Sequence, residues 1–307
     1  MNKLKKIGLT ALAGTLIAGT VNAAEMTVTG SASINLTGLD SSENTGNGFT
    51  MGDSLTFSAS GDVNDIGITL SYEIDGLGGA TDNVDDHSIT LDFGDAGTLV
   101  FAGHGGASAL SARDDVMPTA KEEPWDVVTG GDDDIINGQT QEDMFTYTYA
   151  HDSGFTFVAS YINAAAGETA VSYNDFAIEY TGIDGLRLGY AAGTTEITAG
   201  TEIDEDTMFA TYAMGGLTVG IQVSEADSTA VNGDLESTGF GISYQVSDDL
   251  AVSYGNHEID YATNDDQEAY AIGVSYTMGS IGLSGTFNSV DNVSCLLYTS
   301  DAADELT

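Results

Sequence analysis

The feature that most constrains this chain is a strict two-residue alternation between large apolar and small side chains. Between residues 268 and 278, Ala, Gly, Ser and Thr alternate with five larger residues: Tyr270, Ile272, Val274, Tyr276 and Met278. The same period recurs at 66–75, 217–224 and 240–247. Because successive side chains of a strand point to opposite faces, each segment predicts a strand with one apolar face and one small, polar face.

This pattern predicts fifteen strands after residue 24. Most are close to the ~9–11 residues with which a tilted strand crosses a bilayer. They fall near 26–36, 49–60, 66–75, 87–94, 97–103, 143–151, 154–163, 171–182, 185–193, 206–215, 216–224, 236–247, 249–257, 267–278 and 280–288.

Short and long connections alternate along the chain. Tight turns are separated by polar loops at 37–48, 76–86, 104–142, 164–170, 194–205, 225–235 and 258–266. An outer-membrane barrel has short turns at one rim and long loops at the other. A soluble sandwich or lipocalin-type barrel would instead need an apolar interior and a charged exterior. Here the charges gather in loops and turns, so we predict an all-β, antiparallel transmembrane barrel with a polar lumen.

Both ends of the chain require separate interpretation. Residues 1–23 combine a basic start, an apolar run and a small-x-small site at Val21-Asn22-Ala23, which predicts a secretory signal peptide. Residues 295–307 resemble translated sequencing-adapter DNA. We therefore expect the native barrel to occupy residues 24–294 here and to have lost its last strand. Fifteen strands then become sixteen, since bacterial single-chain barrels have even strand numbers.

The charge of the chain excludes some partners and favours others. After residue 24 only Arg113, Lys121 and Arg187 are basic, against 48 acidic residues. Such a surface repels the phosphates of nucleic acids and attracts cations. The only cysteine is Cys295, in the terminal segment just described, so we expect no disulfide in the barrel.

At this point the chain resembles the sixteen-stranded general porins, especially the acidic, alphaproteobacterial type. The resemblance rests on the signal peptide, the strand count and loop order, and the segment 97–103 followed by the longest loop, 104–142. It implies a homotrimer in outer-membrane lipid that lets small hydrophilic solutes diffuse passively. It also implies that the loop after the fifth strand folds inward and narrows the channel.

The resemblance and the strand phases suggest the residues of the constriction. The loop contributes seven charged candidates: Arg113, Asp114, Asp115, Lys121, Glu122, Glu123 and Asp126. Four more share the lumen-facing phase of their strands: Glu73, Asp92, Glu179 and Arg187. Porins of this family typically oppose the loop acids with a cluster of wall arginines, and this sequence has one. A weak transverse field and a cation preference are therefore expected, although Arg187 could instead be an ion-pair partner of Glu179.

Other sites and functions find less support. Asp132, Asp133 and Asp134 are a candidate calcium site, but an acidic run alone does not provide converging oxygen ligands; otherwise no cofactor is expected. The scattered histidines and the missing Gly-x-Ser-x-Gly motif argue against an enzyme. No Gly-Gly-x-Gly-x-Asp repeat supports a calcium-binding β-roll. A structural or adhesive barrel without a pore stays open as the alternative.

Overall fold

The computed structural model describes residues 4–12, 16–18, 25–39, 49–75, 84–121, 123–124, 135–136, 143–163, 172–198, 201–228, 234–262, 265–279 and 281–291. The first strands are β1 (Leu4–Leu12), β2 (Leu16–Ala18), β3 (Glu25–Leu39), β4 (Phe49–Val63), β5 (Ile66–Asp75), β6 (Val84–Asp92), β7 (Thr98–His104), β8 (Met144–Ala150) and β9 (Phe155–Ile162). The others are β10 (Ser172–Ile183), β11 (Leu186–Thr198), β12 (Thr201–Met214), β13 (Leu217–Ser228), β14 (Leu235–Ser247), β15 (Leu250–Tyr261), β16 (Gln267–Met278) and β17 (Ile281–Asp291).

Two short 3₁₀ turns complete the described elements, η1 (Gly94–Ala96) between β6 and β7 and η2 (Ser111–Arg113) in the segment after β7. No helix within the described ranges is long and apolar enough to span a membrane.

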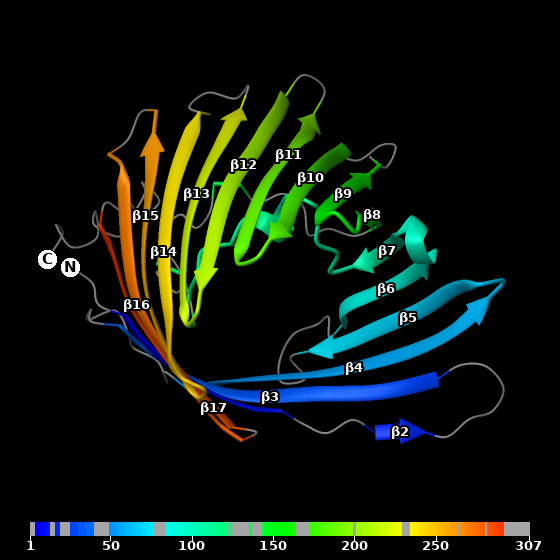
Figure 1. The fold of residues 1–307 in the computed structure, drawn as a ribbon, viewed down its shortest axis with the longest axis horizontal. Coiled ribbons are helices and arrows are strands. Elements are labelled where there is room, and N and C mark those ends of the chain that lie inside the picture. The colour runs from blue at the N-terminus through cyan, green and yellow to red at the C-terminus, as the bar shows by residue number, and fades with distance from the viewer. Residues whose placement is uncertain are drawn as a thin grey trace, which may run out of the picture.

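The fifteen strands from β3 to β17 form a single antiparallel meander, as predicted. Each strand pairs with the next along the chain, from β3 with β4 to β16 with β17. Figure 1 shows the sheet curving so that β3 to β5 lie on the opposite side from β11 to β13. These two groups of strands are therefore facing parts of one curved sheet.

The two faces of the sheet have the predicted chemistry. Ile221, Phe240 and Ile272 point outward and leave 49%, 43% and 54% of their surface exposed. Their neighbours on the inner face are small or polar, and Gln222 and Ser253 are buried there. Large apolar side chains are exposed in the same way on most of the other strands. A soluble protein rarely exposes such an extensive apolar surface. The arrangement suits a barrel whose outer face meets lipid and whose lumen is polar.

The strands at the long-loop rim extend further than predicted. β11 and β12 include most of the predicted loop 194–205, and β13 and β15 run into the predicted loops 225–235 and 258–266. The prediction is wrong at these ends because it takes the first outward acidic residue, such as Asp206 or Glu225, as the end of a strand. A ladder can continue above the hydrocarbon layer, since charged side chains are solvated there.

The two edges of the meander are bridged by residues from the expected signal peptide. β1 pairs antiparallel with β17 on one side and with β3 on the other, and β2 pairs with the beginning of β3. Among the described residues β3 and β17 do not pair directly, so β1 occupies the position between them. The expected last strand after Ser294 lies outside the described residues, and the signal peptide and the sixteen-stranded native barrel stay predictions.

Candidate channel constriction

The long segment after β7 folds into the barrel, as predicted for the loop after the fifth strand. Its described parts, residues 105–121, 123–124 and 135–136, contact inward-facing side chains of strands from β9 to β17. An apolar cluster lies at this junction, where Leu110 and Ile136 are fully buried among inward residues such as Val158 and Ala177. The segment therefore lies along one wall of the lumen, and we call it the inner loop.

Asp175 on β10 holds the beginning of the inner loop. Its Oδ2 accepts hydrogen bonds from the backbone N–H of Leu110 (2.6 Å) and the hydroxyl of Tyr173 (3.0 Å). Ser160 on β9 adds a further acceptor, since its hydroxyl oxygen takes the N–H of Ala109 at 2.8 Å. These bonds satisfy backbone donors that the 3₁₀ turn leaves unpaired, which fixes the direction in which the loop enters the lumen.

At the next contact between the inner loop and the wall, two arginines bind the carboxylate of Glu179 on β10. Arg113 of the inner loop donates through Nε to Oε1 of Glu179 at 2.7 Å, and its Nη2 lies 2.6 Å from the same oxygen. Arg187 on β11 donates through Nε to Oε2 of Glu179 at 2.8 Å. The guanidinium of Arg187 also lies 4.7 Å from the centre of the Phe209 ring. The structure thus contains the ion pair with Glu179 that the sequence offered as an alternative role for Arg187.

Polar side chains of three later strands hold the rest of the inner loop. Gln222 on β13 donates to the carbonyl oxygens of Arg113 and Asp114 at 2.7 and 3.2 Å. The hydroxyl oxygen of Ser253 on β15 accepts the N–H of Ala120 at 2.8 Å. Asn288 on β17 donates to the carbonyl oxygens of Glu123 and Pro124 at 2.9 and 3.2 Å. The inner loop thus crosses the inner face from β9 to β17.

A row of glycines gives the inner loop room to approach the wall. Gly220, Gly241 and Gly255 lie directly opposite one another on β13, β14 and β15. A Cβ at Gly220 or Gly241 would come within 2.5 or 2.9 Å of Pro118, and one at Gly255 within 2.9 Å of Pro124. Such contacts are closer than carbon atoms tolerate. This glycine row is therefore the groove in which the two loop prolines lie.

The wall across the lumen from the inner loop is lined by hydroxyl groups. Their rows follow the register, since Ser58 lies opposite Ser71, which in turn lies opposite Ser88. Ser31 and Ser54 share a hydrogen bond of 2.9 Å. The inward positions that define this hydroxyl wall are Thr27, Thr29, Ser31, Ser33, Ser54, Thr56, Ser58, Ser60, Thr69, Ser71, Ser88 and Thr90.

The structure separates the predicted constriction residues into several places. Asp115 is exposed next to the half-buried Asp114, whereas Arg113 is buried against Glu179 and does not face the gap. Lys121 and Glu123 are half-buried in the inner loop, and on the wall so is Glu73. Asp92 lies at the end of β6 and accepts the N–H of Gly94 at 2.8 Å, which caps the tight turn. Glu122, Asp126, Asp132, Asp133 and Asp134 lie outside the described residues.

Sequence reasoning missed the residues that hold the inner loop, namely Asp175, Gln222, Ser253, Asn288 and the glycine row. A signal was present, because the three glycines share the inward phase of adjacent strands. This signal can be recognised only when the strand register is known, because the register places the three glycines side by side. Pro124 of the inner loop is buried against Gly255, and Trp125, which follows it, lies outside the described residues.

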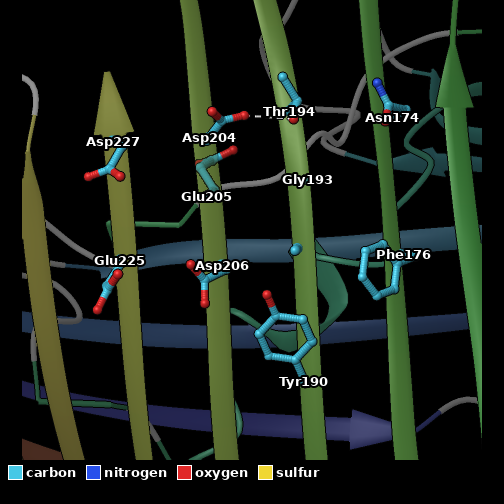
Figure 2. A pocket seen from close by; sticks show the side chains of 11 residues that line it. Asn174, Phe176, Tyr190, Gly193, Thr194, Asp204, Glu205, Asp206, Glu225 and Asp227 are labelled. Carbon is cyan, nitrogen blue, oxygen red and sulfur yellow. Dashed lines mark hydrogen bonds between the residues drawn. The ribbon is translucent and has the colours of Figure 1, made fainter. Parts of the chain in front are cut away.

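A second cluster of charge lies on the outer face and not in the lumen. Figure 2 shows Asp204, Asp206, Glu225 and Asp227 around a hollow of about 200 Å³ between β10 and β13. The carboxylates continue across strands, since Glu225 lies opposite both Asp206 and Glu236. Within the described part of the chain, no three His, Cys, Asp or Glu residues are arranged to hold a metal ion. This outer acidic belt consists of Glu196, Glu202, Asp204, Asp206, Glu225, Asp227, Glu236, Glu258, Asp260 and Glu268.

Solved porins share the fold at low sequence identity. A porin refined at 1.8 Å resolution is 17% identical, with a TM-score of 0.59, over 95% of this chain and 100% of that one. The anion-selective porin from Comamonas acidovorans is 13% identical, with a TM-score of 0.58, over 95% and 100% of the two chains. The trimer form of OmpT, an outer membrane protein of Vibrio cholerae, is 12% identical, with a TM-score of 0.57, over 95% and 99%.

The sequence itself also matches a family. No protein with a curated description matches the chain. The model of the Gram-negative porin family, however, matches residues 8–304, nearly the whole length. The single antiparallel sheet, its apolar outer face and the inner loop after the fifth strand are the features that such a channel needs. The chain belongs to the Gram-negative porins, the channel-forming β-barrels of the bacterial outer membrane.

Proposed function

We propose that this porin is a passive diffusion channel that prefers cations over anions. The observation that carries the proposal is the distribution of charge around the inner loop. Glu179 binds Arg113 and Arg187, two of the three basic residues that follow residue 24, while Asp115 is exposed on the loop. The facing hydroxyl wall contributes no positive charge. A narrow lumen lined in this way has a negative potential, which lowers the free energy of a cation relative to an anion.

The permeating solutes are proposed to be small, hydrophilic molecules and ions. The hydroxyl wall supports this, because Ser and Thr side chains both donate and accept hydrogen bonds and can replace part of the hydration shell of a passing solute. One fold relative is titled anion-selective, but at 13% identity the likeness concerns the fold alone.

Reversal potentials in planar bilayers across a salt gradient test the proposal. The purified full-length protein should give discrete conductance steps and a reversal potential of the sign expected for cation flow. An anion-selective channel would contradict the cation preference. If the folded protein gives no conductance, the alternative of a structural or adhesive barrel takes its place.

We also propose that the protein assembles as a homotrimer and works without a catalytic step. The trimer form of the Vibrio cholerae relative supports the first point. Cross-linking in detergent should give a species of three copies, and a monomer at all protein concentrations would contradict it. The contact between His151 and Ser153 (2.7 Å) does not suggest a hydrolase, because the two residues are two positions apart in one exposed turn. There the backbone N–H of Ser153 also binds the His151 ring.

A further inference from the structure

Glu179 occupies an unusual position among the lumen charges, because it alone holds an arginine of the inner loop and an arginine of the wall. One of its oxygens binds Arg113 and the other binds Arg187, at 2.6 to 2.8 Å. The side chains of Arg113 and Glu179 are only 11% and 12% exposed, and that of Arg187 is 37% exposed. The carboxylate therefore lies between a buried cation and a cation that borders the lumen.

The burial of Arg113 makes its partner indispensable. A guanidinium removed from water is stable only when a carboxylate and further acceptors replace its hydration. Glu179 supplies the charge, and the carbonyl oxygen of Ala109 accepts from Nη1 of Arg113 at 3.0 Å. Without the carboxylate, the guanidinium of Arg113 would have a lower free energy in the lumen, where water can hydrate it, than in its buried position. The part of the inner loop that precedes Asp114 would have to move with it.

The position of Arg187 adds a second consequence. Its side chain borders the lumen, and Glu179 and the Phe209 ring are the groups that contact its guanidinium. When Glu179 is ionised, the nearest negative charge lies 2.8 Å away and reduces the field of the arginine in the channel. The field would act on permeating ions as soon as that partner became neutral.

We propose that Glu179 is a specificity-determining residue, which masks the charge of both arginines while it holds the inner loop against β10. The proposal rests on the proposed channel function and extends it. The cation preference is assigned in part to this one carboxylate, which pairs with Arg113 and Arg187 and offsets one of their two positive charges, in addition to the acids that line the gap. Removing this one negative charge raises the net charge of the three side chains from +1 to +2 and leaves both arginines without the carboxylate that they share.

The test compares reversal potentials of E179Q with those of the wild type. The amide keeps the shape of the side chain and removes its charge, and the permeability ratio of cation to anion should fall about fivefold, the effect of a unit charge ~4 Å away in water. D227N on the exposed outer face changes the net charge by the same amount and serves as the matched control. In salt concentrated enough to screen charges beyond about 3–10 Å it should leave the ratio unchanged.

Two further variants separate masking from a general loosening of the loop. The double variant E179Q/R187Q removes one of the exposed charges and should recover much of the wild-type ratio. R187Q alone lowers the net charge of the three side chains from +1 to 0 and should therefore raise the ratio, by up to about fivefold for a unit charge ~4 Å from the ion path in water, and this variant leaves the buried Arg113–Glu179 pair intact. It is therefore informative even if E179Q does not fold.

Several outcomes would overturn the masking role. They are an E179Q channel with the wild-type reversal potential, a double variant that keeps the full shift, or an R187Q channel whose cation preference falls. These differences between variants are independent of the sign of the wild-type potential, which by itself decides the proposed function.

Discussion

The backbone N–H of Leu110 donates a 2.6 Å hydrogen bond to Oδ2 of Asp175, although the two residues are 65 positions apart. The other oxygen of the carboxylate accepts the N–H of Ser160 at 3.0 Å. One side chain therefore joins the beginning of the inner loop to β9 and β10. The contact is buried, so water cannot replace it when it is lost.

Replacing Asp175 with Ala should release the beginning of the inner loop. Hydrogen bonds to a charged group contribute about 1.5–3 kcal/mol each, so the free energy of unfolding in urea should fall by at least ~2 kcal/mol. Open-channel noise should rise as well. Asp184→Ala, in an exposed turn, is the control and should match the wild type. A quiet channel of unchanged stability would show that Asp175 does not hold the loop.

Gly241→Leu should displace the inner loop from the wall. The new side chain would occupy the space of Pro118, whose Cδ lies 2.9 Å from the position of a Cβ. The single-channel conductance should change, and the fluorescence of Trp125, the only tryptophan, should shift because it follows Pro124 in the same loop. Gly282→Leu is the control, since a Cβ there meets no atom within 4 Å. Equal effects of the two variants would contradict the glycine row as the path of the loop.

Ser58→Arg should weaken the cation preference. The arginine would stand on the hydroxyl wall and strengthen the transverse field, which we expect to be weak in the wild type. We expect the permeability ratio of cation to anion to fall about fivefold or more, as for a unit charge ~4 Å from the ion path in water. Ser58→Gln adds similar bulk without charge. It therefore separates the effect of the electric field from the effect of a narrower channel. If both variants shift the reversal potential equally, bulk and not charge is responsible.

Ile221→Arg should destabilise the barrel because Ile221 faces outward in the apolar band. A basic residue on the lipid face costs about 2–4 kcal/mol near the middle of the bilayer, and unfolding from lipid vesicles measures the cost. Ser243→Arg on the inner face of β14 should cost much less, since its side chain reaches the polar lumen. The reverse order of the two costs would mean that the faces are assigned wrongly.

The stability of the barrel should rise with ionic strength. Asp206, Glu225 and Glu236 lie opposite one another on β12, β13 and β14, and like charges in this arrangement repel. Salt screens the repulsion, with a Debye length of about 10 Å at 0.1 M and about 3 Å at 1 M. Urea unfolding at these two salt concentrations should show a larger gain for the wild type than for D206N/E225Q. An equal gain would locate the salt effect elsewhere.

The sequence alone predicts the strands well, but it predicts their ends at the long-loop rim badly. Alternation such as that from Tyr270 to Met278 has one structural solution in a lipid-exposed sheet, and β16 follows it closely. The ends fail where charge is taken for a loop, as at Asp206 and Glu225, because solvated side chains do not interrupt a ladder. The charge pattern reports the border of the apolar layer, and hydrogen bonding decides where a strand stops.

The inner loop was predictable in its direction but not in its contacts. Its resemblance to the loop after the fifth strand of the general porins implies that it folds inward. The partners of Leu110, Arg113 and Pro118 come from strands 65 to 123 residues further along the chain. Which of many inward side chains meets which loop residue depends on strand register and shear, and local sequence does not encode either one.

The outer acidic belt places a dense negative charge around the outside of one rim of the barrel. Ten carboxylates stand on the strand ends beside the long loops, which in outer-membrane barrels face the outside of the cell. In dilute medium they enrich mobile cations in the water just above the membrane, before any ion reaches the inner loop. In a salty environment this enrichment fades while the buried charges keep their effect. The belt therefore adds a salt-dependent local concentration of cations outside the barrel to the constant effect of the fixed charges near the inner loop.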